Sequence, residues 1–304
     1  MVPGTIIPGY QRCTLCIADL LMEIRGIDAV EHLPNLAPFA IEKEQTDGRT
    51  VICTVEMGRQ ITPETSAPTL TSTAKDKSIH VWLTPEHCKI ALTRSNGNNC
   101  LMQATREWET VETDLQLDAQ ESYATLNDLI MIAFVYSSAL HSTTTIHASS
   151  VMIGDEACAF IGPSGVGKST HAAMWLQHIN GARLLNDDQP AIRLFNDGSV
   201  RIYGTPWSGK TPCYINEKAT LKSLFFMEQS RSNSLAQMNS IETYQQLMKA
   251  TSLIGRDTVT FRKISDTQAK TASLIPAYTL KNTPSPEALA LSHGAFTHSN
   301  TPQQ

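Results

Sequence analysis

The sequence lacks several features that would place the protein in other functional classes. Its net charge is −5 over 304 residues, so it has no basic excess of the kind that nonspecific nucleic-acid binding requires. No stretch approaches the roughly eighteen apolar residues needed to cross a bilayer. The N-terminal segment has neither a basic region nor a long apolar core, so it does not resemble a signal peptide. We therefore expect a cytoplasmic protein with no nucleic-acid or membrane partner.

A disulfide framework is also missing. The chain has 7 cysteines, an odd number scattered along its length, which is typical of free thiols in a reducing compartment. Cys13 and Cys16 form an isolated Cys-x-x-Cys pair, and no second ligand pair stands at a familiar zinc spacing, although His87 and Cys88 are available. Because residues 13–24 form an amphipathic run, we expect a helix that places both thiols near the core rather than metal or redox chemistry.

The most informative feature that is present is Gly-Pro-Ser-Gly-Val-Gly-Lys-Ser-Thr at residues 162–170. It matches the P-loop (Walker A) pattern G-x-x-x-x-G-K-[ST] at every fixed position. Glycines allow successive N–H groups to ring a phosphate, and the helix that follows points its positive end at the same anion. Lys168 is predicted to reach the β- and γ-phosphates, and Ser169 to bind Mg²⁺. The predicted ATP-binding residues are Gly162, Pro163, Ser164, Gly165, Val166, Gly167, Lys168, Ser169 and Thr170.

The flanking sequence has the order that this motif requires. Residues 157–161 are a short apolar run that predicts a buried strand before the loop. Residues 170–180 predict a helix after it, capped by Gly181. The apolar face expected for this helix consists of Ala172, Ala173, Met174, Leu176 and Ile179.

Two adjacent carboxylates, Asp187 and Asp188, follow the next short apolar run. An Asp-Asp pair alone is more often a solvated turn. At this distance from a P-loop, a strand returning beside the P-loop strand would bring the pair to the Mg²⁺. We expect one aspartate to bind the metal and the other to deprotonate the attacking hydroxyl. The candidate metal ligands are Ser169 and Asp188, but the sequence does not say which aspartate is the base.

A lysine further along the chain is a second candidate cation. Residues 200–203 predict a strand, and Lys210 ends the glycine-interrupted segment that follows it. Lys210 would help to neutralise a transferring phosphoryl group. A surface lysine on a turn explains the local sequence equally well.

The pattern of elements divides the chain into two predicted domains. Residues 1–118 predict a mainly β module preceded by one helix, with strands at 50–55, 79–83, 89–93 and 108–111, a loop at 62–76 and a hairpin at Asn96-Gly97. We expect this module to recognise a substrate. Residues 119–304 predict the nucleotide-binding catalytic domain, with helices at 123–140, 241–254 and 284–291 and strands at 221–227 and 275–280. Gly154-Asp155 predicts a hairpin that pairs the P-loop strand with the strand before it, so we expect an α/β (α+β) fold with a mixed sheet.

Taken in order, His147, the hairpin, the glycine motif and the aspartate pair resemble the catalytic domain of HPr kinase/phosphorylase and the related nucleotide core of phosphoenolpyruvate carboxykinase. The segments 204–210 and 276–280 look more like the small bacterial proteins of this type, some of which are described as serine kinases. The resemblance covers roughly residues 143–291. It implies that His147 is an active-site residue, as a metal ligand or an acid–base group, and that Asp187 and Asp188 match the kinase pair.

The sequence therefore predicts an ATP- and Mg²⁺-dependent phosphotransferase that acts on a serine-type hydroxyl of a protein, peptide or small molecule. Its candidate catalytic residues are His147, Asp187, Asp188 and Lys210. A nucleotide-binding sensor without turnover is the second hypothesis, and carboxykinase chemistry is the third. The third lacks support because the extra substrate-binding segments of full carboxykinases are absent. The acceptor, the direction of transfer and the oligomeric state stay open, and an oligomer is compatible with the sequence.

Overall fold

A computed structural model describes residues 11–74, 76–117, 121–209, 211–251, 254 and 256–298. The chain forms two compact units, Met1–His141 with Leu253–Phe261 and Ser142–Ser252 with Arg262–Gln304. The first unit extends beyond residue 118, the boundary predicted from the sequence, because the long helix α2 (Glu121–Ala139) packs against strand β4 of that unit. Within the described part of the chain, no helix has the length and apolarity to span a membrane.

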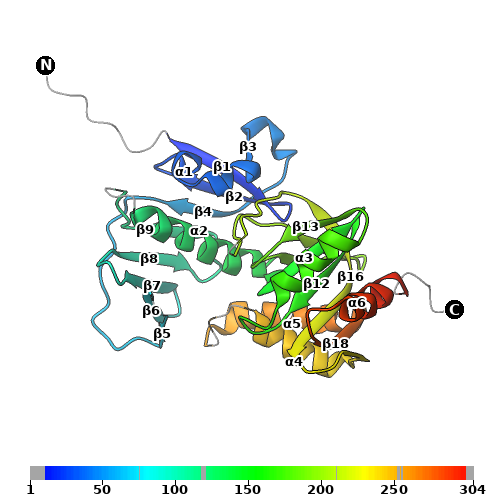
Figure 1. Cartoon of the computed structure of the whole chain (residues 1–304). Coiled ribbons are helices and arrows are strands. Elements are labelled where there is room, and N and C mark those ends of the chain that lie inside the picture. Colours follow the sequence, from blue (N-terminus) through cyan, green and yellow to red (C-terminus); the bar gives the residue numbers. More distant parts are fainter. Residues whose placement is uncertain are drawn as a thin grey trace, which may run out of the picture. The chain divides into compact units, whose positions relative to one another are not determined.

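The first unit is built on a nine-stranded sheet with the order β3-β1-β2-β4-β9-β8-β7-β6-β5 (Figure 1). Pairs β2–β4 and β4–β9 are parallel, and the other pairs are antiparallel. The predicted Asn96-Gly97 hairpin is confirmed: it joins β7 to β8, and Gly97 has a φ of 86°. The strands are β1 (Arg12–Ile17), β2 (Leu20–Arg25), β3 (Ala40–Ile41), β4 (Val51–Glu56), β5 (Leu70–Thr73), β6 (Lys77–Leu83), β7 (His87–Arg94), β8 (Asn99–Thr105) and β9 (Thr110–Thr113). The short helices are α1 (Ala29–His32), η1 (Pro34–Phe39) and η2 (Lys43–Thr46).

The helix predicted over residues 13–24 is wrong. These residues form the β1–β2 hairpin, whose turn residues Ala18 and Asp19 both have positive φ, as a tight hairpin turn requires. The prediction failed because β1 and β2 are buried over most of their length, which removes the alternation that would have revealed strands. Cys13 and Cys16 are three positions apart in a strand and so point to opposite faces, an arrangement that cannot converge on one metal ion.

The second unit is built on a mixed sheet with the order β10-β14-β15-β16-β12-β11-β13, to which β18 adds on β16 and β17 on β18. Two pairs are parallel, β12–β16 and β16–β18. The predicted mixed sheet and the Gly154-Asp155 hairpin between β11 and β12 are confirmed. The strands are β10 (Thr143–Thr145), β11 (Ala148–Ile153), β12 (Glu156–Ile161), β13 (Ala182–Asn186), β14 (Ala191–Leu194), β15 (Val200–Tyr203), β16 (Lys218–Gln229), β17 (Ser234–Gln237) and β18 (Ala277–Asn282). The helices are α3 (Lys168–His178), α4 (Ser240–Ala250), α5 (Thr258–Leu274) and α6 (Pro286–His298).

Both faces of this sheet are covered, and the central strands show why. Along β12, Ala157, Ala159 and Ile161 join a core cluster that includes Leu247 of α4 and Ala272 of α5. The alternate residues of β12 join a second cluster with α3 and α6. Strand β16 divides its side chains in the same way. Successive residues of a strand point to opposite faces, so a strand that is buried on both faces is apolar at every position. The apolar run at residues 157–161, which predicted the strand before the glycine loop, has this origin.

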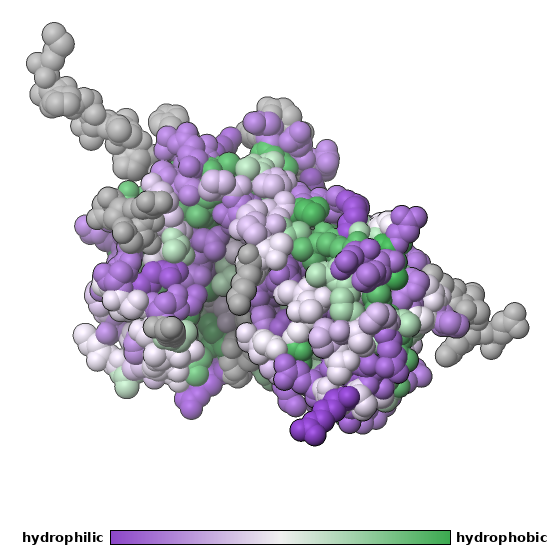
Figure 2. Space-filling model, viewed as in Figure 1, coloured by the Kyte–Doolittle hydropathy of each residue, from purple (hydrophilic) through white to green (hydrophobic). Residues whose placement is uncertain are grey.

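Helix α3 begins at Lys168, directly at the glycine loop, rather than at residue 170. Its buried face agrees only in part with the predicted one: Ala172 is buried, and Met174 and Ile179 pack against the core, but Leu176 is 40% exposed. The other buried residues of the helix are His171, Trp175 and Lys168. Apolar side chains are accordingly visible over α3 on a largely hydrophilic surface (Figure 2). The shift of the buried face follows from α6, because Ser292 accepts hydrogen bonds from Trp175 Nε1 and lies 2.9 Å from His171 Nε2.

Candidate functional site

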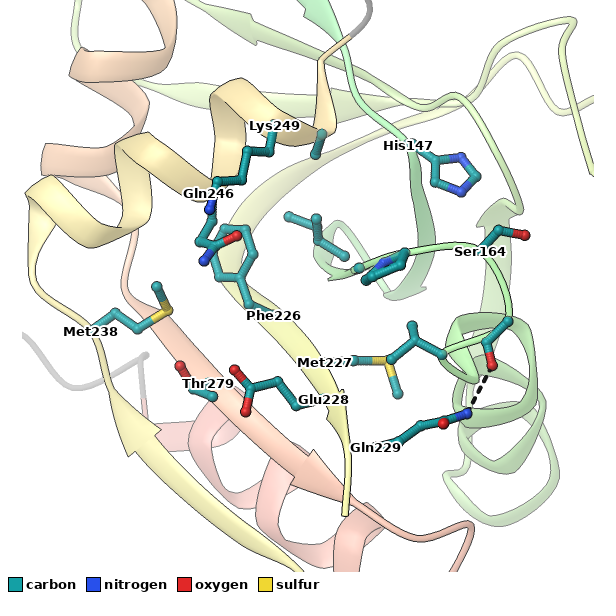
Figure 3. Close-up of a pocket in the computed structure, with 16 residues that line it drawn as sticks. His147, Ser164, Phe226, Met227, Glu228, Gln229, Met238, Gln246, Lys249 and Thr279 are labelled. Carbon is teal, nitrogen blue, oxygen red and sulfur yellow. Dashed lines mark hydrogen bonds between the residues drawn. The ribbon is translucent and has the colours of Figure 1, made fainter. Parts of the chain in front are cut away.

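The glycine loop, residues Gly162–Thr170, connects the end of β12 to the start of α3. Gly165 and Gly167 have φ values of 82° and 107°, which side chains other than glycine rarely tolerate. At Gly162 the constraint is space, since an added Cβ would lie 2.9 Å from Val166 Cγ1 and 3.1 Å from Met227 O. Gln229 at the end of β16 donates to Gly165 O at 3.0 Å (Figure 3). The loop is therefore fixed by its own glycines and by the neighbouring parallel strand.

Lys168 is the first residue of α3, and its side chain folds back under the loop. Its Nζ donates to Gly162 O at 2.9 Å and to Pro163 O at 3.2 Å, and it lies 2.9 Å from His147 Nε2. Lys168 is only 8% exposed. Burial lowers the pKa of this ammonium group, and the nearby carboxylates of Asp188 and Asp187 oppose that shift. The residue is thus a buried cation directed to the inner side of the loop.

His147 connects Lys168 to the aspartate pair. His147 Nδ1 lies 2.9 Å from Asp188 Oδ1. A protonated lysine can only donate, so His147 Nε2 is the acceptor and the ring proton sits on Nδ1, which donates to Asp188. The three predicted site residues therefore form a chain in which the carboxylate fixes the histidine tautomer and the histidine accepts from the lysine.

The sheet topology explains how three segments far apart in sequence meet. The prediction that the aspartate strand lies beside the P-loop strand is wrong: β13 pairs with β11, and β11 separates it from β12. Strand β12 has no free side, since β11 and β16 occupy both. Because β11 is antiparallel to both β12 and β13, its beginning lies at the same edge as their ends. Ala148 N donates to Asp188 O at 3.1 Å across this edge.

Asn186 and Asp187 precede Asp188, and both are buried. Asn186 Nδ2 donates to three acceptors on Thr205 and Trp207, and its Oδ1 accepts from the N–H groups of Asp188 and Gln189. The turn that carries the aspartates is therefore rigid. Asp187 Oδ1 is buried without a hydrogen-bond partner among the described residues. A buried carboxylate oxygen left in this state fits a ligand for a cation.

The segment from 204 to 209 packs against the same turn. A Cβ at Gly209 would lie 2.8 Å from Asp187 O, so the loop can approach the aspartates only because this residue is glycine. Lys210, the second candidate cation, lies outside the described residues. Ser169 and Thr170 are exposed at the start of α3. Over the described ranges, no cluster of three or more His, Cys, Asp or Glu side chains is arranged to hold a metal by itself.

A cavity of about 720 Å³ opens beside the loop (Figure 3). Its walls include His147 and residues 162–166 on one side, the end of β16 below, and helix α4 on the other side. Sequence reasoning missed the residues of the far wall. The residues at the end of β16 could have been predicted as part of the site, because a strand parallel to β12 must end at the same edge of the sheet as the glycine loop. Helix α4 carried no such signal. The cavity-lining residues that were not predicted include Phe226, Met227, Glu228, Gln229, Met238, Gln246, Lys249 and Thr279.

Comparisons with known proteins add little to this geometry. No family model and no curated protein matches the chain. Among solved structures, the chain is similar to the Hpr(Ser) kinase/phosphatase from Coxiella burnetii, with 12% sequence identity and a TM-score of 0.28. The match covers 51% of this chain and 88% of the other. At this score the similarity carries no argument about activity.

Proposed function

We propose that the second unit is an ATP- and Mg²⁺-dependent phosphotransferase that transfers the terminal phosphoryl group of the nucleotide to a hydroxyl group. The observation that carries this proposal is the set of hydrogen bonds that connects Asp188, His147 and Lys168 on the inner side of the glycine loop. A buried lysine under a glycine-rich loop at the start of a helix suits a polyphosphate, and a histidine oriented by a carboxylate suits proton transfer. A sensor that only binds nucleotide has no need of the second feature.

The glycine loop and Lys168 would bind and orient the nucleotide. Lys168 Nζ has two backbone carbonyls and His147 Nε2 as acceptors. A phosphate oxygen that accepts from Lys168 would replace the histidine and leave His147 Nε2 able to accept a proton from a hydroxyl. Asp188, which accepts the hydrogen bond from His147 Nδ1–H, would stabilise the imidazolium that results. Nucleotide binding and activation of the base are coupled in this arrangement.

The residues also fit Mg²⁺. Asp187, with its unpartnered buried oxygen, and the Ser169 hydroxyl would hold the ion together with phosphate oxygens, while Asp188 is occupied by His147. This differs from the sequence-based assignment of Asp188 to the metal. When bound, Mg²⁺ neutralises charge on the phosphates and aligns them for in-line attack.

The bond changes in the proposed step balance. The acceptor oxygen forms a bond to the γ-phosphorus as its proton passes to His147 Nε2. The bond between the γ-phosphorus and the bridging oxygen breaks, and ADP leaves with that electron pair. Lys168 stabilises the charge that collects on the transferring group and the leaving oxygen.

Calorimetric titration with MgATP tests the proposal. We expect the wild type to bind, and Lys168→Ala to weaken binding by roughly 100-fold, since a charge-assisted contact to a phosphate is lost. Lys270→Ala is the matched control: Lys270 is an exposed lysine on α5 of the same unit, and its loss should change nothing. No nucleotide uptake by the wild type would refute the proposal.

A second measurement separates a kinase from a sensor. In cell extract with ATP, the wild type should add a phosphoryl mass to an acceptor, and Asp188→Asn should slow this by about 10²–10⁴-fold while nucleotide binding persists. The sensor would be favoured if the wild type labelled no acceptor and if the wild type and Asp188→Asn restored the function of cells that lack the protein equally well.

A further inference from the structure

The inner side of the glycine loop faces the large cavity. Lys168 Nζ is bonded to the carbonyls of Gly162 and Pro163 and to His147, and all three of these residues line the cavity. A smaller cavity of about 230 Å³ lies on the other side of the loop, against Gly167, Thr170 and His171. The hydrogen-bond partners of the Lys168 ammonium group therefore line the large cavity, and terminal phosphates bound by Lys168 would lie beside it. The nucleoside end of the same nucleotide would lead away from it.

The floor of the large cavity is apolar. Phe226 of β16 and Met238, which precedes α4, lie on the α4 face of the sheet, whereas Met227 points to the opposite face, next to Gly162 of the glycine loop (Figure 3). Phe226 belongs to the core cluster of that face and Met238 packs against the same cluster, so this apolar surface is fixed by the core. An apolar surface of this kind binds the hydrocarbon part of a ligand and excludes water from it.

Polar groups lie on the far wall, opposite His147. Lys249 and Gln246 are both on α4, three positions apart, and in Figure 3 the lysine side chain runs toward the glutamine amide. Neither side chain forms a hydrogen bond or ion pair with any residue that the structure describes. Across the floor, Glu228 at the end of β16 bears a negative charge, which disfavours a second anionic group there.

Building on the proposed function, we infer that this cavity binds the phosphoryl acceptor and that the acceptor carries an anionic group. The hydroxyl would lie at His147, a hydrocarbon segment would cover Phe226 and Met238, and a carboxylate or phosphate would be bound by Lys249 with Gln246. The cavity thus selects a small hydroxylated anion with an apolar middle, rather than a neutral alcohol.

Matched probes test the charge preference. A series of straight-chain ω-hydroxy carboxylates is compared with the diols of the same lengths, by ligand-observed NMR on protein saturated with a non-hydrolysable MgATP analogue. We expect at least one carboxylate to bind about tenfold more tightly than its diol. Lys249→Gln should abolish the preference, Lys249→Arg should retain it, and Lys270→Gln, the control, should leave it unchanged.

The outcomes separate this inference from the proposed function. If the analogue is not taken up, both fall. If it is taken up but no carboxylate binds better than its diol, or Lys249→Gln keeps the preference, the inference alone is overturned. Displacement of the bound carboxylate by adenosine would assign the cavity to the nucleoside and would also overturn it.

Discussion

At the scale of single residues, the hydrogen bonds from Lys168 to His147 and from His147 to Asp188 carry the proposed function. Lys168, His147 and Asp188 were each predicted as site residues, because the glycine motif and the residues flanking it are informative. Their arrangement as a hydrogen-bonded chain depends on β11 lying between β12 and β13, and no local pattern encodes that pairing. The cavity residues on α4 were missed for the same reason.

Glycine at position 204 is required by packing, which the sequence also could not show. A Cβ there would lie 1.9 Å from Ile215 O and 3.0 Å from Leu185 O, so the backbone would have to move. We expect Gly204→Ala to lower the free energy of unfolding by about 3 kcal/mol or more. Urea denaturation of the whole chain measures this change.

Gly294 is the matched control for that substitution. It lies inside α6, and a Cβ at this position would meet nothing within 4 Å. Gly294→Ala should raise the free energy of unfolding by about 0.5–1 kcal/mol, since alanine is the better helix former. Equal effects of the two substitutions would contradict the close approach at Gly204.

At the scale of elements, helix α5 shows where hydrophobic periodicity fails. Its residues were not predicted to form a helix, yet the buried positions have helical spacing. Most of the buried side chains are polar and form hydrogen bonds within the protein: Gln268 Nε2, for example, donates to Thr144 Oγ1 at 3.0 Å and Thr251 Oγ1 at 2.8 Å, although Gln268 Oε1 has no partner among the described residues. Hydrophobic periodicity detects a helix only by an apolar face, so it does not indicate a helix whose buried face is polar. The buried positions are Thr260, Ile264, Thr267, Gln268, Thr271 and Ala272.

The first turn of α5 provides a test of such buried polar contacts. Asp257 is fully buried, and it accepts from Arg106 Nη2 at 2.6 Å, from Thr260 Oγ1 at 2.8 Å and from Val259 N at 3.3 Å. Asp257→Ala would leave Arg106, whose side chain is 14% exposed, without this partner and would remove a helix cap. We expect a loss of about 3–5 kcal/mol in the free energy of unfolding.

Asp266, an exposed aspartate on the same helix, is the control for this change. Its replacement by alanine should alter stability by less than about 0.5 kcal/mol. Thermal denaturation of the two variants compares them directly. If Asp257→Ala were as stable as Asp266→Ala, the ion pair with Arg106 would contribute nothing to the fold.

At the scale of the whole molecule, both units contain cysteines, and their environments are alike. All seven are free, and six of them are buried. Burial raises the pKa of the thiols of Cys53, Cys88 and Cys100 to about 12 and that of Cys13 and Cys213 to about 11, and it raises the pKa of Cys158 as well. The sequence-based expectation of free thiols is thus matched by the environment of nearly every cysteine, although the helix proposed for the first two was wrong.

Raised pKa values predict slow thiol chemistry in the native protein. A rise in pKa from 9 to 11 lowers the thiolate fraction at pH 8 by about a hundredfold, and the thiolate is the reactive form. In a disulfide-exchange assay at pH 8, we expect these thiols to react at least that much more slowly in the native protein than in denaturant, where all seven should react quickly. If two thiols of the native protein instead reacted quickly, and both fast reactions were lost in Cys13→Ser, Cys13 and Cys16 would form a reactive pair. The hairpin places those two thiols on opposite faces of a strand, so this result would contradict the structure of the first unit itself.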